Sequence, residues 1–272
     1  MPKIDSTARV ADGARLADDV EVGPYCVIGA QVEVRSGVRL LSHVNLSGIT
    51  VIGERSVIYP FSSLGTPPQS TAYRGGPTRL VVGNDCLIRE GVTMSTGTEA
   101  GGAVTTVGDR CFLMANSHVA HDCTVGSDVI FANGAVLGGH VTVADHAFIG
   151  GNTAVHQFVR VGESAMLGGM SGITRDVIPF GFAFGPKADL VGLNVVGLRR
   201  RGYSSEDIRR LRSACRTLFQ DAGTFAERCK TAAAQFGDDP VVGKVLSFIR
   251  VGGSRPLMMA AADDKIDSDA TQ

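Results

Sequence analysis

Hydrophobic residues recur at every sixth position along most of this chain. The series is unbroken over positions 4–64, resumes at 82–94, and then continues without a break over 107–173. An α-helix repeats about every 3.6 residues and a strand about every 2, so a fixed period of six fits neither element alone. The period instead predicts a repeat architecture in which each unit buries one residue against its neighbours.

The other positions of the six-residue unit support this interpretation. The residue after the hydrophobic one is often glycine, as at Gly23, Gly53 and Gly108, which suits a corner with unusual backbone angles. The residue two before the hydrophobic one is small or β-branched, which suits a short, tightly packed strand. The unit resembles the hexapeptide repeat of the left-handed parallel β-helix, in which three hexapeptides, about 18 residues, form one triangular coil. We therefore expect a mainly β protein with this fold, and its handedness is taken from the resemblance.

We expect the β-helix to occupy residues 1–185, with two interruptions. Segment 66–79 holds three prolines and segment 95–106 is rich in glycine and threonine, so both are predicted to be loops ejected from the coil. Repeat proteins place binding residues on such insertions, although a tolerated insertion without a function would have the same composition.

After the repeat ends, a small helical domain is predicted over 186–253. Capping signals predict three helices, which begin at Ser204 or Ser205, at Thr224 and at Asp239. The tail over 254–272 is rich in alanine, aspartate and serine, and this composition predicts disorder.

Composition narrows the functional classes. The formal net charge is −1, which argues against nucleic acid as the main partner. No apolar run reaches the roughly 18 residues of a membrane span and the N-terminal residues lack the apolar core of a signal peptide, so we expect a cytoplasmic protein without a transmembrane segment. The six cysteines include no C-x-x-C pair, and four occupy the small buried position of the repeat, so they are interpreted as packing residues.

Four of the six histidines are predicted to share one edge of the prism, namely His118, His121, His140 and His156. Residues one coil apart lie above one another at about 4.8 Å, which stacks His121, Gly139 and Gln157. Such a cluster favours a functional site, whereas a single histidine would more often be structural. A purely structural or binding β-helix has no use for four histidines on one edge.

Two chemistries suit the cluster. Neutral histidines can ligate zinc. Alternatively, a histidine near a carboxylate such as Asp122 can act as a general base on a hydroxyl, with a backbone N–H nearby for an oxyanion. Gly139 would let a reacting carbonyl approach the main chain without a side chain in the way.

Five motifs carry a closer resemblance. They are NSHVAHDCTVG (116–126), LGGHVTV (137–143), GGNTAVHQF (150–158), LGGMSG (167–172) and GLNVVGLRRRGY (192–203). Together they resemble the UDP-N-acetylglucosamine O-acyltransferases that open lipid A biosynthesis, and the likeness extends from residue 1 to the end of the helical domain. This pattern is more specific than the hexapeptide repeat, which many acyltransferases share.

The resemblance implies a role for each matching residue. His121 matches the catalytic base, Asp122 the carboxylate beside it, and Gly139 the oxyanion donor. The positions that match sugar, acyl, nucleotide or phosphate contacts are Gln69, His118, His140, His156, Gln157, Asn194, Arg200 and Arg201. Gly169 matches the floor of the acyl-chain groove, where Met166 and Met170 could intrude.

The resemblance also implies the reaction and its partners. A fatty acyl group, expected to be 3-hydroxyacyl, would pass from acyl carrier protein to the 3-position of a UDP-amino sugar, UDP-N-acetylglucosamine. The enzyme would need no cofactor and would be a homotrimer with sites at subunit interfaces.

Three positions depart from the family pattern. Ser70 and Ala72 stand where the family commonly has aspartate and lysine, and Lys187 replaces a common histidine. These departures leave open whether the acceptor offers a 3-hydroxyl, which gives an ester, or a 3-amino group, which gives an amide. The length of the acyl chain is also open, and a zinc-dependent enzyme of the hexapeptide class is a more remote alternative.

Overall fold

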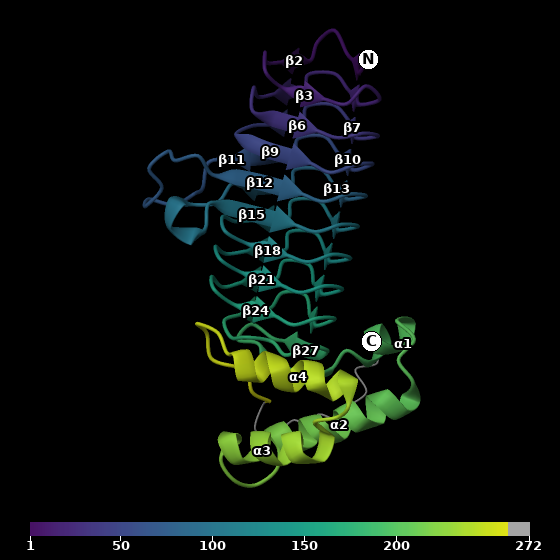
Figure 1. Ribbon diagram of the computed structural model, residues 1–272, viewed down its shortest axis with the longest axis vertical. Helices are drawn as coiled ribbons and strands as arrows, with labels where there is room; N and C mark the ends of the chain where they lie inside the picture. Colours follow the sequence, from purple (N-terminus) through teal and green to yellow (C-terminus); the bar gives the residue numbers. More distant parts are fainter. Residues whose placement is uncertain (261–272) are drawn as a thin grey trace.

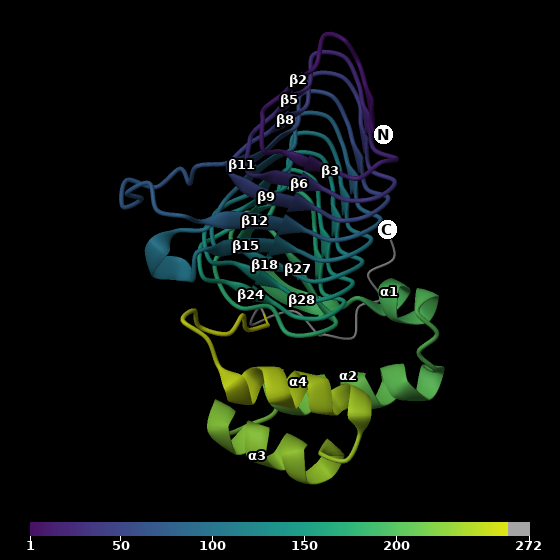
Figure 2. The same cartoon turned by 45° about the horizontal axis from the view of Figure 1, so that its top comes forward.

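The computed structural model describes residues 1–260, in which short strands form the three faces of a prism (Figures 1 and 2). Sheet A contains β1 (Lys3–Ile4), β4 (Glu21–Val22), β7 (Arg39–Leu40), β10 (Val57–Ile58), β13 (Leu87–Ile88), β16 (Phe112–Leu113), β19 (Ile130–Phe131), β22 (Phe148–Ile149), β25 (Met166–Leu167), β27 (Gly181–Phe184) and β28 (Asp189–Leu193). Sheet B contains β2 (Arg9–Val10), β5 (Val27–Ile28), β8 (Asn45–Leu46), β11 (Ser63–Thr66), β14 (Thr93–Ser95), β17 (His118–Val119), β20 (Val136–Leu137), β23 (Ala154–Val155) and β26 (Gly172–Ile173). Sheet C contains β3 (Arg15–Leu16), β6 (Val32–Val34), β9 (Ile49–Ile52), β12 (Arg79–Val82), β15 (Val104–Val107), β18 (Thr124–Val125), β21 (Thr142–Val143) and β24 (Arg160–Val161).

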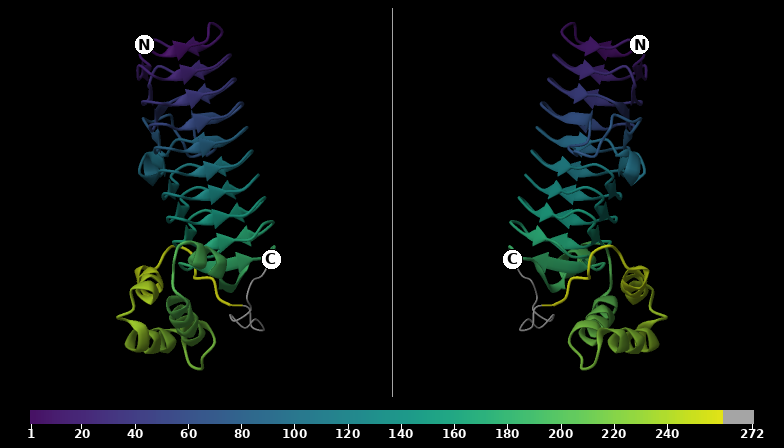
Figure 3. Two further views of the ribbon diagram at one scale, coloured as in Figure 1. Left: turned by 90° about the vertical axis from the view of Figure 1, so that its right-hand side faces the viewer. Right: turned by 90° about the vertical axis from the view of Figure 1, so that its left-hand side faces the viewer.

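The chain visits sheets A, B and C in turn, so three strands and three turns make one coil. Consecutive coils pair in parallel, with Val119 opposite Leu137 and Leu137 opposite Val155, an offset of 18 residues. Figure 3 shows these coils stacked along the prism. The prediction of a left-handed parallel β-helix of hexapeptide repeats is confirmed.

The hydrophobic residue of each hexapeptide points into the prism and forms its core. Leu64, Met94 and Val119 are completely buried. Ile4 has the same place in the repeat but is 42% exposed, because no coil lies above the first one. Burial of one residue per strand along the whole prism therefore explains the period of six.

Two insertions leave the prism between sheets B and C. One joins β11 to β12 over residues 67–78, and the other joins β14 to β15 over 96–103 and includes the 3₁₀ turn η1 (Glu99–Gly101). The ladder continues in register across both, since Ile52 pairs with Val82 and Val82 with Val107. Both loops project from the same edge, at the left of Figure 1.

The β-structure extends past residue 185, where the sequence predicts that the β-helix ends. Strands β27 and β28 form an antiparallel hairpin that extends sheet A to Leu193. Leu190 and Leu193 on this hairpin are buried, and their antiparallel pairing has no counterpart in the hexapeptide period. A division at residue 185 therefore passes through the hairpin, and the helices begin at Val195.

Four helices follow the hairpin, namely α1 (Val195–Arg200), α2 (Ser205–Phe219), α3 (Phe225–Phe236) and α4 (Pro240–Val251). The last three begin at the predicted caps Ser204, Thr224 and Asp239, whose side chains accept N–H bonds from the first turn. The six-residue α1 was not predicted. None of the helices described over residues 1–260 is long and apolar enough to cross a membrane.

The first part of the predicted disordered tail is ordered, which corrects the prediction for residues 254–260. Asp176 N–H donates to Pro256 O at 2.9 Å, Met258 N–H donates to Asp176 O at 2.8 Å, and Met258 is completely buried. The apolar side chains at 257–259 give this segment something to bury, which the composition of the whole tail concealed. Residues 261–272 lie outside the described part of the chain.

Candidate active site

The turns that join sheet B to sheet C form one edge of the prism, here called the B–C corner. The two loops leave the prism at this corner, and it carries the residues predicted to stack: His118 begins β17, His121 and Asp122 follow β17, Gly139 and His140 follow β20, and His156 and Gln157 follow β23. The 18-residue spacing therefore brings these side chains together as predicted by coil geometry.

His121 and Asp122 are at the centre of this group. His121 Nδ1 lies 2.8 Å from Asp122 Oδ2, and the Asp122 side chain is completely buried. Asp122 has φ of +60°, a left-handed conformation that aspartate adopts more readily than most residues. Since an ionised carboxylate only accepts hydrogen bonds, the His121 proton is on Nδ1 and Nε2 keeps a free lone pair. This is the tautomer that a general base requires.

The second loop supplies donors to the buried carboxylate. Thr98 donates its N–H to Asp122 Oδ1 at 2.8 Å and its hydroxyl to Oδ2 at 2.6 Å. A Cβ atom on Gly101 would lie 2.2 Å from Asp122 Cγ, and one on Gly97 would lie 2.9 Å from Oδ1. Glycine at both positions lets the loop close over the carboxylate. Thr98 is a site residue that sequence reasoning missed, because the 18-residue spacing does not extend into the loops.

The two loops are joined through Glu99. Its Oε1 atom accepts the N–H groups of Gly76 at 2.7 Å and Arg74 at 3.2 Å. Backbone N–H groups, first its own and then that of Gly76, hold the pKa of Glu99 below its ordinary value. The first loop, which carries Gln69, is therefore anchored to the loop that buries Asp122.

The departures from the family pattern lie in this first loop. Ser70 Oγ accepts the Ala72 N–H at 3.3 Å, and Ser70 O accepts the Tyr73 N–H at 3.2 Å. Ser70 is thus engaged in a local turn, and Ala72 offers no polar side chain.

Gly139 lies directly against the His121 ring. A Cβ atom at this position would be 2.5 Å from His121 Cε1 and 2.8 Å from Nε2. Within residues 1–260, the Gly139 N–H makes no hydrogen bond. The absence of a side chain therefore makes room for the imidazole, and a backbone donor is available beside its free nitrogen.

The surroundings of the two neighbouring histidines, His118 and His140, favour the uncharged form of each ring. The His140 ring stacks on Phe158, with centroids 4.5 Å apart, and its Nε2 is 3.7 Å from Asp122 Oδ2. His118 Nδ1 lies 2.7 Å from Thr93 Oγ1. Burial lowers the pKa of both His118 and His140. At neutral pH these rings therefore add no positive charge beside His121.

The lower end of the corner meets the C-terminal segment. His156 and Gln157 are exposed, and Arg255 contacts both of them. Sequence reasoning missed Arg255, because it lies in the segment that was predicted to be disordered and is far from the histidines in the sequence.

A cleft of about 420 Å³ opens at the B–C corner. Its walls are formed by Gln69, Ser95, His118, Ala120, His121, Val136, Leu137, Gly138, Gly139, Val155 and Gln157. Polar side chains and aliphatic surface therefore face the same space, as a ligand with polar and apolar parts requires.

One group of described residues could hold a metal ion. The ligand atoms of His121, Asp122 and His140 lie within 4.8 Å of one another. The Asp122 oxygens already accept bonds from Thr98 and lie against the His121 N–H, so a metal would have to replace these interactions.

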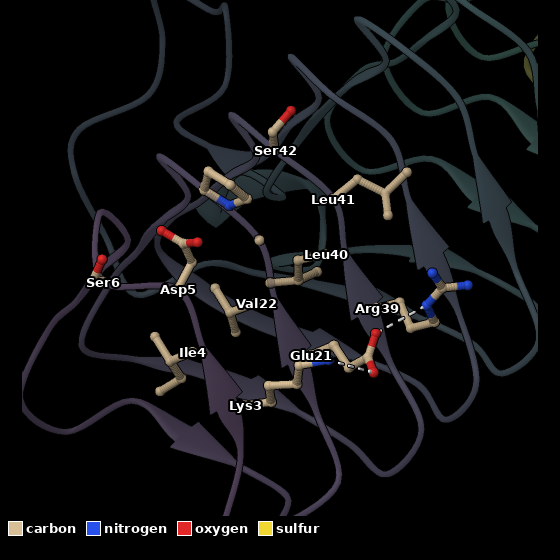
Figure 4. Close-up of a pocket in the computed structure, with 12 residues that line it drawn as sticks. Lys3, Ile4, Asp5, Ser6, Glu21, Val22, Arg39, Leu40, Leu41 and Ser42 are labelled. Carbon is tan, nitrogen blue, oxygen red and sulfur yellow. Dashed lines mark hydrogen bonds and ion pairs between the residues drawn. The ribbon is translucent and has the colours of Figure 1, made fainter.

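A larger hollow of about 590 Å³ lies on sheet A and the turns that follow it in the first coils, away from His118, His121, His140 and His156 (Figure 4). Three of its charged side chains form a cluster, since Glu21 lies 3.7 Å from Lys3 Nζ and 3.3 Å from Arg39 Nε. This hollow has no histidine, and its polar groups do not match the predicted chemistry.

Within one chain, the residues of the predicted acyl-chain groove do not lie at the B–C corner. Gly169 and Met170 are in the turn between β25 of sheet A and β26 of sheet B, here called the A–B corner, and Met166 is on β25. Met170 is 72% exposed. A Cβ atom on Gly169 would lie 3.2 Å from the backbone oxygen of Gly151 in the preceding coil, which is a tight contact.

The predicted nucleotide-binding residues are also separated from His121. Arg200 and Arg201 are exposed at the end of α1, on the opposite side of the molecule from the loops (Figures 1 and 2). Asn194 is buried, donates to Ser164 O at 2.9 Å and accepts the Gly197 N–H at 2.9 Å. In this chain Asn194 therefore caps α1, and its contact with a nucleotide stays a prediction.

Comparisons with known proteins agree with this arrangement. Residues 176–258 match the family model "Udp N-acetylglucosamine O-acyltransferase; Domain 2", and residues 105–139 match "Bacterial transferase hexapeptide (six repeats)". The chain is 58% identical over 254 residues to the acyl-[acyl-carrier-protein]–UDP-N-acetylglucosamine O-acyltransferase of Azorhizobium caulinodans, covering 93% of this chain and 94% of the relative.

Solved structures give the same result. LpxA from Acinetobacter baumannii superposes with a TM-score of 0.91 at 37% identity, covering 94% of this chain and 99% of the other. The Francisella novicida UDP-N-acetylglucosamine acyltransferase superposes with a TM-score of 0.92 at 30% identity, covering 99% of each chain. The chain therefore belongs to the UDP-N-acetylglucosamine O-acyltransferase family.

Proposed function

We propose that this protein is a cytoplasmic acyltransferase that moves a 3-hydroxyacyl group from acyl carrier protein to the 3-hydroxyl of UDP-N-acetylglucosamine, the first step of lipid A biosynthesis. The observation that carries this proposal is the His121–Asp122 pair, whose free Nε2 lies against Gly139 in a cleft. The names of the relatives supply the donor and the acceptor, and the geometry supplies the mechanism.

In this mechanism His121 acts first as a base and then as an acid. Its Nε2 takes the proton of the acceptor hydroxyl, whose oxygen attacks the thioester carbonyl and forms a tetrahedral intermediate. Collapse of the intermediate breaks the C–S bond, and the departing sulfur takes the proton from Nε2. The products are the ester and the free thiol of acyl carrier protein, and His121 returns to its starting state.

Asp122 and Gly139 assist without exchanging protons. The Asp122 carboxylate keeps the His121 proton on Nδ1 and stabilises the imidazolium when it forms, as in other histidine–carboxylate pairs. The Gly139 N–H, unpaired within residues 1–260, can donate to the oxyanion of the intermediate.

We further propose a homotrimer in which each cleft is completed by a second copy. Gly169 at the A–B corner and Arg200 and Arg201 beside α1 are distant from His121 in their own chain, so they can serve the same reaction only if another copy brings them to the B–C corner. Two further apolar side chains at the A–B corner, Tyr25 and Phe61, are 58% and 67% exposed, which supports an interface there.

Light scattering should give three times the chain mass. Mixed trimers of a His121→Ala chain and an Arg201→Ala chain should regain activity that neither variant has alone, because some clefts then combine an intact base with an intact arginine. A fully active monomer, or no recovery on mixing, would contradict a shared cleft.

The hydroxyl acceptor is preferred over the amine. The relatives are named O-acyltransferases, and the Ser70–Ala72 turn is closed on itself and presents no new charged group to an amino sugar. Mild base distinguishes the products, because it cleaves an ester and leaves an amide intact. A base-resistant product would reverse this choice.

The base itself is tested with His121→Ala. General-base catalysis contributes about 10²–10⁴-fold, so the rate should fall by at least about 10² while the fold is kept. His146→Asn is a matched control, since His146 is on the corner between sheets C and A and has a left-handed φ that asparagine tolerates. An active His121→Ala protein would end the assignment.

A further inference from the structure

The chain segment after α4 returns to the lower end of the B–C corner. It is the yellow segment that rises from the end of α4 toward β24 (Figures 1 and 2). Two backbone hydrogen bonds to Asp176, through Pro256 O and Met258 N–H, fix it there, and Met258 is completely buried. Arg255 therefore lies in a segment held by the prism and does not belong to a free tail.

The segment is also held before Arg255. A Cβ atom on Gly253 would lie 2.5 Å from Arg160 Nε and 2.6 Å from Asp176 Oδ2. The chain therefore passes directly over the Arg160–Asp176 ion pair, whose atoms are 2.7 Å apart, and a side chain at this point would have to displace that pair. The chain is therefore held on both sides of Arg255, by the close contact at Gly253 and by the hydrogen bonds of Pro256 and Met258, and this fixes the position of the Arg255 backbone.

The Arg255 guanidinium binds two acceptors with one edge. Nε donates to Gln157 O at 3.0 Å, and Nη2 lies 2.8 Å from His156 Nδ1. A guanidinium has only donors, so His156 Nδ1 must accept, and the ring is neutral with its proton on Nε2. The 3.2 Å between His156 Nδ1 and Gln157 O is then the separation of two acceptors held by the same fork.

The Arg255 guanidinium affects the cleft indirectly, because the turn that it holds, residues 156–158, contributes to the cleft wall. Gln157 lines the cleft together with His121 and Gly139. The next residue, Phe158, has φ of +66° and supports the His140 ring. Fixing Gln157 O therefore fixes the turn that presents Gln157 to the cleft and Phe158 to His140.

We propose that Arg255 is a positioning residue for the acyl-transfer site, an inference that rests on the proposed function. Arg255 holds the 156–158 turn in place and sets the tautomer of His156, so that His156 offers Nε2–H as a donor to an oxygen atom of the bound substrate. It acts through His156 and Gln157 and touches no reacting atom.

The test combines a spectroscopic readout with kinetics. Nitrogen-15 NMR of the histidine rings should show His156 with its proton on Nε2 in the wild-type protein at neutral pH. Arg255→Met removes every donor, so it should produce a mixture of tautomers and lower kcat/KM by about tenfold or more. Arg255→Lys should recover part of the rate, because an ammonium group can replace one of the two hydrogen bonds.

Arg250→Met is the matched control, because Arg250 is exposed in the last turn of α4, and it should leave both the tautomer and the rate unchanged. A wild-type His156 with its proton on Nδ1 would overturn the proposal even if Arg255→Met failed to fold. An Arg255→Met protein with the wild-type tautomer and rate would also overturn it. A wild-type protein inactive toward UDP-N-acetylglucosamine would instead refute the proposed function, and the NMR result would still decide the tautomer.

Discussion

Replacing Gly139 with alanine tests the position of His121, the proposed catalytic base, most directly. The added Cβ would lie 2.5 Å from His121 Cε1 and 2.8 Å from Nε2. Carbon atoms in good contact are about 3.5–4.0 Å apart, so the ring has to move by about 1 Å. His121 Nδ1 is 2.8 Å from Asp122, and Asp122 is buried and held by Thr98, so the ring and not the carboxylate will be displaced.

The expected cost follows from that displacement. A misplacement of about 1 Å at a reacting group can cost about 10²-fold in rate, which corresponds to about 2.7 kcal/mol of transition-state stabilisation. The loss should appear mainly in kcat, because the substrate contacts made by the other walls of the cleft are unchanged. Gly139 is buried, but the added methyl group presses on the His121 ring and not on the hydrophobic core, so stability should fall by less than kcat.

The assay is steady-state transfer from acyl carrier protein, with the thermal midpoint measured in parallel. Gly29→Ala is a matched control, because Gly29 is at the same corner several coils away and its Cβ would have no neighbour closer than 3.4 Å. In a double variant with His121→Ala, the Gly139 substitution should cost little more, since both act on the same ring. A Gly139→Ala enzyme with the wild-type kcat would refute the assigned position of the base.

Three further outcomes are expected. Because burial lowers the pKa of His118 and His140, the unfolded chain binds protons first as the pH falls below about 6.5, so the free energy of unfolding should fall from pH 7.5 to 5.5, and His118→Asn should reduce that fall. A chelator should leave activity unchanged and added zinc should inhibit by binding His121 and Asp122, whereas loss of activity on chelation would favour a zinc enzyme. Gly169→Met should shift preference toward shorter acyl donors, and unchanged chain selectivity in competition assays would remove Gly169 from the groove.

The sequence predicts the prism well because the fold is periodic. Each coil buries the same positions, so the period of six identifies the strands, the core and the side chains that share a corner. The same logic fails where pairing stops being periodic. The β27–β28 hairpin buries Leu190 and Leu193 by antiparallel pairing, and the 254–260 segment is ordered by Met258 and by bonds to Asp176, neither of which has a repeat signature.

In the candidate site, too, the residues on the periodic coils could be predicted and those outside them could not. His121, Gly139 and Gln157 could be placed together because spacing along the chain becomes distance along the prism. Thr98 and Arg255 could not, because a loop and a returning tail bring them to the corner without any fixed spacing. Hydrogen-bond partners of this kind depend on tertiary contacts that composition does not encode.

Spacing along the sequence predicts which residues share a corner of the prism, but it cannot predict contacts between residues at different corners. A β-helix stacks residues of one corner but never brings two of its own corners together, because the packed core lies between them. The family resemblance assigns Gly169 and Arg201 to the same reaction as His121, and the structure places them on different sides of one chain. Both can hold only if the reacting site is built between copies. The chemistry of the base can therefore be argued from one chain, whereas the acyl-chain selectivity and nucleotide binding that we propose depend on the proposed trimer.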